Sequence, residues 1–194
     1  LSKKIEDDPN MNKKKAACAI ARFLTLHPYN LAQKTEVMIE HFRQVTLKKI
    51  GGKAKAMVVT ASREHVVRYK HEFDRYLKEK GYKDIKALVA FSGTVLLDGI
   101  PPEYTEPGMN GFGEKELPEK FATSEYQILL VAEKYQTGYD EPLLHTMYVD
   151  KRLDGVKAVQ TMSRLNRTCP GKEDTFILDF VNKREDILAA FQPY

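Results

Sequence analysis

Two arginines and a glutamine near the end of the chain are spaced so that they could act together on one ligand. Gln160, Arg164 and Arg167 stand at positions i, i+4 and i+7, which would align them along one face of a helix. The pair Pro170-Gly171 is expected to end this helix. Guanidinium groups are permanent cations with planar forks of donors, so two of them one turn apart are suited to gripping a polyphosphate.

The charge pattern alone favours a plainer interpretation, in which both arginines belong to a solvated basic helix face. The choice depends on which elements surround the helix and on which residues those elements bring to its side.

The composition indicates an ordinary soluble globular protein. The chain has 194 residues, of which 42% are hydrophobic and 30% charged, and these values argue against a disordered or membrane-spanning chain. The formal net charge of +4 permits a nucleic-acid partner without demanding one. Cys18 and Cys169 are far apart and suit a reducing cytosol rather than a disulfide framework. We see no secretory signal, and the missing initial methionine suggests a fragment.

The hydrophobic pattern divides the chain into a helical extension and an α/β domain. Apolar residues recur at helical spacing up to about residue 52, with a break at His27-Pro28, and strand and helix patterns alternate from residue 53. The predicted strands cover residues 56–60, 85–91, 126–132, 144–150 and 175–181, and the predicted helices cover 63–80, 114–123, 158–167 and 182–191. Strands this apolar belong in a parallel sheet with helices on both faces. We therefore expect a helical extension over residues 1–52 and one α/β domain over residues 53–194.

The stretch Asp98 to Pro118 interrupts this alternation with four prolines and four glycines. Connections of this length without secondary structure are uncommon in compact domains. The stretch is either a functional loop or an ordered surface excursion, and its sequence leaves both open.

Small polar residues follow three of the predicted strands. In a parallel sheet, ligands bind beyond the carboxyl ends of the strands, where loops lead into helix N-termini. Hydroxyl groups and exposed amides there can cap a helix or bind a phosphate. The residues in question are Thr60 and Arg63, then Ser92 and Gly93, and then Thr137, Gly138 and Asp140.

Two stretches of the sequence resemble motifs of superfamily 2 helicases. Residues 129–142, with Thr137-Gly138-Tyr139-Asp140, resemble motif V, and Gln160-x-x-x-Arg164-x-x-Arg167 resembles motif VI. Their order and separation are those of a second RecA-like domain. A larger set of segments, from about Leu26 onwards, is similar to the motor part of the restriction (R, HsdR) subunit of type I restriction–modification enzymes. It includes Leu31-Ala32-Gln33-Lys34-Thr35, Ala90-Phe91-Ser92-Gly93 and residues 143–150. The resemblance implies a RecA-like fold of the P-loop NTPase type.

The resemblance also implies roles in nucleotide chemistry. Arg164 and Arg167 match arginine-finger positions, which reach the terminal phosphate of ATP held by the first RecA-like domain. Gln160 matches the polar residue that opens motif VI and is expected near the same phosphates. Asp140 matches the motif V acid that contacts the nucleotide ribose, and we assign Gly138 to the same nucleotide site.

The implied DNA contacts lie on the loops after the strands. Thr137 and Gly138 match motif V positions whose hydroxyl and amide meet the DNA backbone. The corresponding DNA-facing loops carry Thr60, Arg63, Ser92 and Gly93.

Several motifs of a complete ATP motor are absent from this sequence. It has no GxxxxGK[ST] phosphate loop and no acidic box after a strand, so ATP and Mg²⁺ would be held mainly by the first motor domain of the full subunit. The five histidines have no zinc-like spacing, and we expect no metal site. His145, inside an apolar strand, is expected to be a packing histidine.

We therefore expect a motor-domain fragment of an ATP-dependent double-stranded DNA translocase in a type I restriction endonuclease, a hydrolase of the prokaryotic cytoplasm. The expected partners are double-stranded DNA, the first RecA-like and nuclease domains of the same subunit, and the methyltransferase and specificity subunits. The fragment alone should be inactive. Two alternatives stay open: another superfamily 2 DNA helicase, such as a repair helicase, and a DNA-binding module without a motor role.

Overall fold

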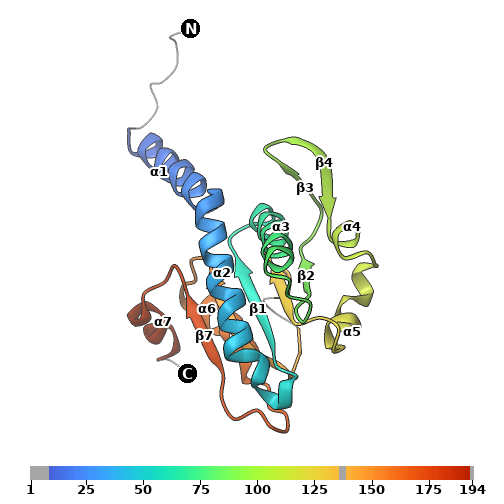
Figure 1. Cartoon of the computed structure of the whole chain (residues 1–194). Coiled ribbons are helices and arrows are strands. Elements are labelled where there is room, and N and C mark those ends of the chain that lie inside the picture. The colour runs from blue at the N-terminus through green and yellow to red at the C-terminus, as the bar shows by residue number, and fades with distance from the viewer. Residues whose placement is uncertain (1–8, 136–138, 193–194) are drawn as a thin grey trace.

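A computed structural model describes residues 9–135 and 139–192 of the chain. At its centre lies a five-stranded sheet in which all strands run parallel, in the order β2-β5-β1-β6-β7 (Figure 1). The strands are β1 (Lys55–Thr60), β2 (Ala87–Ala90), β5 (Ile128–Val131), β6 (Leu144–Asp150) and β7 (Phe176–Asp179). The predicted parallel α/β class is confirmed.

All helices except the short one at Glu106–Asn110 form where the apolar spacing predicted them, with shifted ends. The helices are α1 (Pro9–Leu26), α2 (Pro28–Gln44), α3 (Arg63–Lys80), α4 (Glu106–Asn110), α5 (Leu117–Ala122), α6 (Gly155–Met162) and α7 (Arg184–Phe191). Local sequence explains the bounds of α3. The Ser62 hydroxyl caps its start by accepting a hydrogen bond from the His65 amide, and Gly81 ends it at a φ of 69°, a left-handed conformation that favours glycine.

Helices cover both faces of the sheet, as predicted, because side chains of a strand alternate between faces. Ala56 and Val58 of β1 face a core that α2 and α3 complete. Met57 and Val59 of the same strand face a second core, which α5, α6 and the segment after it complete and against which α7 packs. The arrangement is a three-layer α/β fold (Figure 1).

The second N-terminal helix is part of the core. Its residues Met38, Ile39 and Phe42 have no exposed surface, and they pack in the same cluster as the sheet residues on that face. In α1, by contrast, Ile20 and Phe23 are 60% and 68% exposed, and the helix projects from the sheet layers (Figure 1). The division of the chain after residue 52 stays a prediction.

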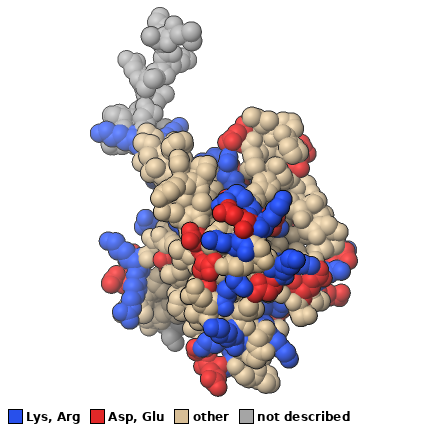
Figure 2. All heavy atoms as spheres, viewed as in Figure 1, with Lys and Arg blue, Asp and Glu red and all other residues tan. Residues whose placement is uncertain are grey.

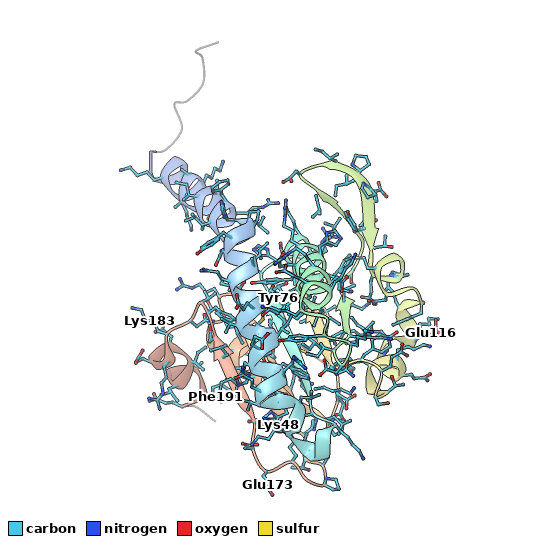
Figure 3. All side chains as sticks on the ribbon, in the orientation of Figure 1. Lys48, Tyr76, Glu116, Glu173, Lys183 and Phe191 are labelled. Carbon is cyan, nitrogen blue, oxygen red and sulfur yellow. The ribbon has the colours of Figure 1, made fainter. Side chains whose placement is uncertain are left out.

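Polar contacts join α2 and α3 to the sheet and to each other. Asp150 at the end of β6 is buried, and its two carboxylate oxygens accept bonds from Lys34 Nζ at 2.6 Å and from the Tyr69 hydroxyl at 2.5 Å. The Tyr76 side chain, labelled beside α2 in Figure 3, donates its hydroxyl to Glu40 at 2.8 Å. A buried carboxylate needs such partners, because an unpaired charge is strongly unfavourable away from water.

The stretch from Asp98 to Pro118 is an ordered surface excursion. It contains the second half of an antiparallel hairpin, β3 (Thr94–Leu97) and β4 (Ile100–Thr105), followed by α4. We predicted no strand here, because the prolines and glycines obscure any alternation. Asn110 of α4 pairs through its side-chain amide with both the N–H and the C=O of Val89, so it occupies the free edge of β2.

Within the part of the chain that the structure describes, every helix is too short or too polar to cross a lipid bilayer.

The packing of α2 predicts how much this helix contributes to stability. Phe42→Ala should lower the free energy of unfolding by about 3–5 kcal/mol, because it removes a fully buried ring and leaves a cavity. Val37→Ala, on the same helix but 47% exposed, should change it by less than about 0.5 kcal/mol. Urea denaturation of both variants measures the difference, and equal effects would show that α2 does not belong to the cooperative core.

Candidate functional site

The segment that carries Gln160, Arg164 and Arg167 is not one continuous helix. The α-helix ends at Met162, and residues Ser163–Asn166 form a tighter 3-10 turn. Arg167 is already extended, with φ −70° and ψ 128°. Our prediction of a helix through Arg167 was therefore wrong, because the Ser163 hydroxyl bonds back to the Val159 carbonyl and the chain tightens before Pro170 can end the helix.

Arg164 reaches from this turn to the connection between β5 and β6. Its NH1 group donates to the Tyr139 carbonyl at 3.1 Å, and its Nε donates to the Gln160 carbonyl at 3.3 Å. The guanidinium is partly buried, so its direction is set by these two carbonyls. Gln160 lies on α6 and is exposed to solvent.

Arg167 forms an ion pair with Asp140 on the surface. Their Nε and Oδ1 atoms are 3.0 Å apart, and the two side chains are 55% and 63% exposed. Exposed ion pairs contribute only about 0–1 kcal/mol, because water and salt screen them. The pair therefore places the two groups side by side, but it is too weak to prevent Arg167 from binding another anion.

Lys172 fixes the backbone of this arginine segment. Its ammonium donates to the carbonyls of Leu165 and Arg167 on one side, and of Pro142 and Leu144 on the other, at 2.7–3.2 Å. An ammonium has three N–H groups, so four carbonyls more than satisfy it. Burial lowers the pKa of Lys172. We missed this role of Lys172 in the sequence, because no sequence spacing indicates it.

Four of the predicted DNA-facing residues come together at the carboxyl ends of β1 and β2. Arg63 NH1 donates to the Ser92 carbonyl at 2.9 Å. Gly93 has a φ of 76°, a conformation that favours glycine, and a Cβ atom there would lie 2.8 Å from Arg63 NH1 and displace the end of that side chain. Thr60 is fully buried, and its hydroxyl donates to the Val131 carbonyl of β5. The exposed members of the group are Arg63, Ser92 and Gly93.

A cleft of about 600 Å³ opens beside Arg63, between the end of α1 and the start of α3. Its lining includes the basic residues Arg22, Arg63, Lys151 and Arg152 against the acidic Glu64 and Asp150, so positive charge prevails. His65 lies at its wall, with its ring nitrogens 2.8 Å from Ser62 Oγ and 3.1 Å from Thr25 Oγ1. Burial lowers the pKa of His65 more than the nearby carboxylates raise it.

On the face that carries α2 and α3, charges of both signs alternate (Figure 2). Figure 2 shows basic and acidic side chains interspersed over the face that carries α2 and α3. The net charge of +4 is therefore not gathered into one patch on this face.

The remaining predictions concern residues 137–138, His145 and a metal site. Thr137 and Gly138 lie outside the described residues. His145 is a packing histidine, as expected: it is 1% exposed and contacts Thr146 Oγ1 and Asp174 Oδ1 at 2.8 and 2.9 Å. Among residues 9–135 and 139–192, no cluster of three or more His, Cys, Asp or Glu side chains could hold a metal ion.

Comparison with known proteins connects this arrangement to one family. Residues 103–182 match the family model of domain 3 of the type I restriction enzyme subunit R. The chain is 30% identical over 172 residues to the type I restriction enzyme MjaVIIP endonuclease subunit of Methanocaldococcus jannaschii, a match that covers 83% of this chain and 16% of the relative. The chain thus spans about a sixth of the length of that curated relative.

Solved structures share the fold. A fragment of an HsdR subunit of a type I restriction enzyme from Vibrio vulnificus superposes with a TM-score of 0.54 at 18% identity, over 86% of this chain and 30% of the other. The helicase-fold protein Mss116p, solved with single-stranded RNA and AMP-PNP, gives a TM-score of 0.53 at 16% identity, over 84% of this chain and 28% of the other. At these identities the likeness establishes the RecA-like fold alone.

The buried position of His65 predicts a pH effect on stability. Because the pKa of His65 is lower in the folded chain than its ordinary value of 6.5, the unfolded chain binds the proton more readily. The stabilising contribution is present above pH 6.5 and is lost as the pH falls below it. The difference in unfolding free energy between wild type and His65→Gln, measured from pH 7.5 to 5.5, should shrink with falling pH. A constant difference would contradict the prediction.

Proposed function

Because this chain belongs to the family of type I restriction enzyme R subunits, we propose that it forms the second RecA-like half of an ATP-driven motor that moves along double-stranded DNA. Arg164, Arg167 and Asp140 gather at one surface segment, which Lys172 anchors, and this observation carries the proposal. In the full subunit this half would contribute arginine fingers and part of the DNA track, before cleavage by the nuclease domain.

Arg164 and Arg167 are proposed to stabilise the charge that develops on the terminal phosphate of ATP during hydrolysis. Positioned cations are worth most when they meet charge that appears only in the transition state. Arg164 is partly buried and aimed by two carbonyls, which limits the reorganisation needed on closure. Arg167 is held only by its weak surface pair with Asp140, so it can exchange that carboxylate for a phosphate oxygen.

The other nucleotide contacts are proposed on the same surface. Gln160 would lie near the phosphates, and Asp140, released from Arg167, would accept hydrogen bonds from the ribose hydroxyls. Gly138, as the sequence predicts, is assigned to the same nucleotide site. Two guanidinium forks, one partly buried at Arg164 and one exposed at Arg167, fit a triphosphate. Mg²⁺ needs carboxylate and phosphate oxygens, which the first RecA-like domain would mainly supply. ATP and Mg²⁺ would therefore be shared between the two halves, and this chain alone would not hydrolyse ATP.

The DNA track is proposed along the carboxyl ends of β1, β2 and β5. Arg63 supplies a fixed cation and Ser92 and Gly93 supply an exposed backbone, which suit contacts to phosphates rather than to bases. Thr60, which is buried, would act by joining the ends of β1 and β5, while Thr137 would meet the backbone itself.

Wider partners follow from the family. We propose that the chain works with the first RecA-like and nuclease domains of its own subunit and with methyltransferase and specificity subunits, in the prokaryotic cytoplasm. The helical extension over residues 1–52 and the motor domain over 53–194 would be its two parts.

The arginine assignment predicts a loss of turnover without loss of fold. In the intact R subunit, Arg164→Ala or Arg167→Ala should lower kcat of DNA-stimulated ATP hydrolysis by about 10³-fold or more, because arginine fingers act in the transition state. Circular dichroism and thermal unfolding check that folding is retained. Arg75→Ala is the matched control, since Arg75 is an exposed arginine of α3 whose partners are Glu72 and Glu79. Wild-type turnover in both finger variants would refute the assignment.

The track assignment predicts a salt effect. Binding of double-stranded DNA by the R subunit should weaken linearly in a plot of log affinity against log salt, and Arg63→Ala should reduce the slope by about one contact. Binding titrations at several salt concentrations measure the slope, again with Arg75→Ala as the control. An unchanged slope for Arg63→Ala would remove Arg63 from the track, and salt-independent, sequence-specific binding would favour a module without motor function.

A further inference from the structure

An ion cluster joins the surface excursion to the connection between β5 and β6. Lys134 Nζ lies 2.9 and 3.0 Å from the two carboxylate oxygens of Glu106 at the start of α4, and 2.8 Å from Glu114 Oε2. The contact between Lys134 and Glu106 spans 28 residues of sequence. Lys134 lies within the stretch that resembles motif V, whereas Glu106 and Glu114 lie outside the motifs that suggested the function.

Glu106 is a buried carboxylate that holds Lys134, and it is not a surface acid. Its side chain is 1% exposed, and Oε2 also accepts the Phe91 amide at 2.8 Å, just beyond the end of β2. Burial raises the pKa of Glu106, although Lys134 and the Phe91 amide lower it. A buried carboxylate of this kind needs its cation, so Lys134 has one favourable position.

The backbone around Lys134 is held in an unusual conformation. Glu133 and Tyr135, on either side of it, both have a φ of 62°, in the left-handed region that residues other than glycine rarely adopt. Strain of this kind persists only where surrounding contacts impose it. The ion cluster supplies such contacts between the two strained residues.

Aromatic packing continues from this turn to an arginine. The ring of Tyr135 packs on that of Tyr139 with centroids 4.7 Å apart, and Tyr139 is only 6% exposed. The carbonyl of Tyr139 is the one that accepts the bond from Arg164 NH1. The contacts therefore run from Glu106 through Lys134, Tyr135 and Tyr139 to Arg164.

We propose that Lys134, clamped by Glu106 and Glu114, is a positioning residue that sets the direction of Arg164 through Tyr135 and Tyr139. The proposal rests on the proposed function, because it assigns Arg164 a role in ATP hydrolysis. The surface excursion of residues 98–118 would then have a role at the site, because it supplies Glu106 and Glu114, the carboxylates that hold Lys134 and through it position Arg164.

Steady-state ATP hydrolysis by the intact R subunit, with saturating double-stranded DNA, tests the proposal. Lys134→Met should lower kcat by about tenfold or more while the KM for ATP changes by less than about twofold, because a misdirected arginine is lost from the transition state and not from ground-state binding. Lys134→Arg keeps the charge and can reach both carboxylates, so it should restore most of kcat. Lys86→Met removes an exposed lysine that pairs with Glu125 and should leave kcat unchanged.

The aromatic step has its own matched pair. Tyr135→Leu removes the ring that packs on Tyr139 and should lower kcat in the same way, whereas Tyr135→Phe keeps the ring and should remain near wild type. If Lys134→Met does not fold, Glu114→Gln replaces it, since Glu114 is 50% exposed and its loss leaves the buried Glu106 pair intact. That variant should lose about two- to threefold in kcat by the same mechanism.

Arg164→Ala, measured in the same series, separates the two proposals. Wild-type turnover in Arg164→Ala would overturn the proposed function of this arginine. Loss of turnover in Arg164→Ala together with wild-type kcat in Lys134→Met and in Tyr135→Leu would overturn only the positioning role. A fall in kcat that Lys134→Arg does not rescue, or that comes with an equal loss of thermal stability in every variant, would reduce Lys134 to a structural ion pair and likewise overturn it.

Discussion

The structure depends on burying a parallel sheet on both of its faces. Every residue of β1 and β6 is buried, so these strands can present polar groups to solvent only beyond their ends. The one carboxylate at the end of β6, Asp150, is itself buried and needs both Lys34 and Tyr69 as partners. The polar groups that the sheet can offer to a ligand therefore lie beyond the strand ends, in the loops and the helix starts that follow them, which is where the arginine segment and the Arg63 group lie.

The connection between β5 and β6 links the buried sheet to the arginine segment. It leaves the sheet after Val131, passes the ion cluster of Lys134, and gives Arg164 its acceptor at Tyr139 before β6 begins. The two left-handed residues beside Lys134 cost about 1–3 kcal/mol each and persist only where surrounding contacts impose them, and the ion cluster is such a contact. On its far side, Lys172 joins this connection to the turn that bears Arg167.

Exposure separates ion pairs that hold the fold from those that can exchange partners. Lys34–Asp150 and Lys134–Glu106 each place a carboxylate with 1% exposure beside a largely buried ammonium, and breaking either would leave an uncompensated charge inside the protein. Arg167–Asp140 lies in solvent on both sides and is weak. The proposed motor role uses this difference, because the fold stays fixed while one guanidinium remains able to bind another anion.

The hydrophobic periodicity of the sequence was sufficient to predict the five strands of the sheet, the helices on both faces and the parallel class, because these follow from the local spacing of apolar residues. The motif residues Gln160, Arg164 and Asp140 could also be named, since residue type and order are properties of the sequence. The end of α6 at Met162, the hairpin in the excursion, and the contacts of Lys172 and Lys134 could not be predicted. Each depends on groups brought together by folding: Lys172 contacts carbonyls up to 30 residues away, and Lys134 meets a carboxylate 28 residues away. Sequence alone determined which side chains were available, and only the tertiary structure decided what held them, because hydrogen bonds to carbonyls and buried ion pairs leave no periodic signal in the chain.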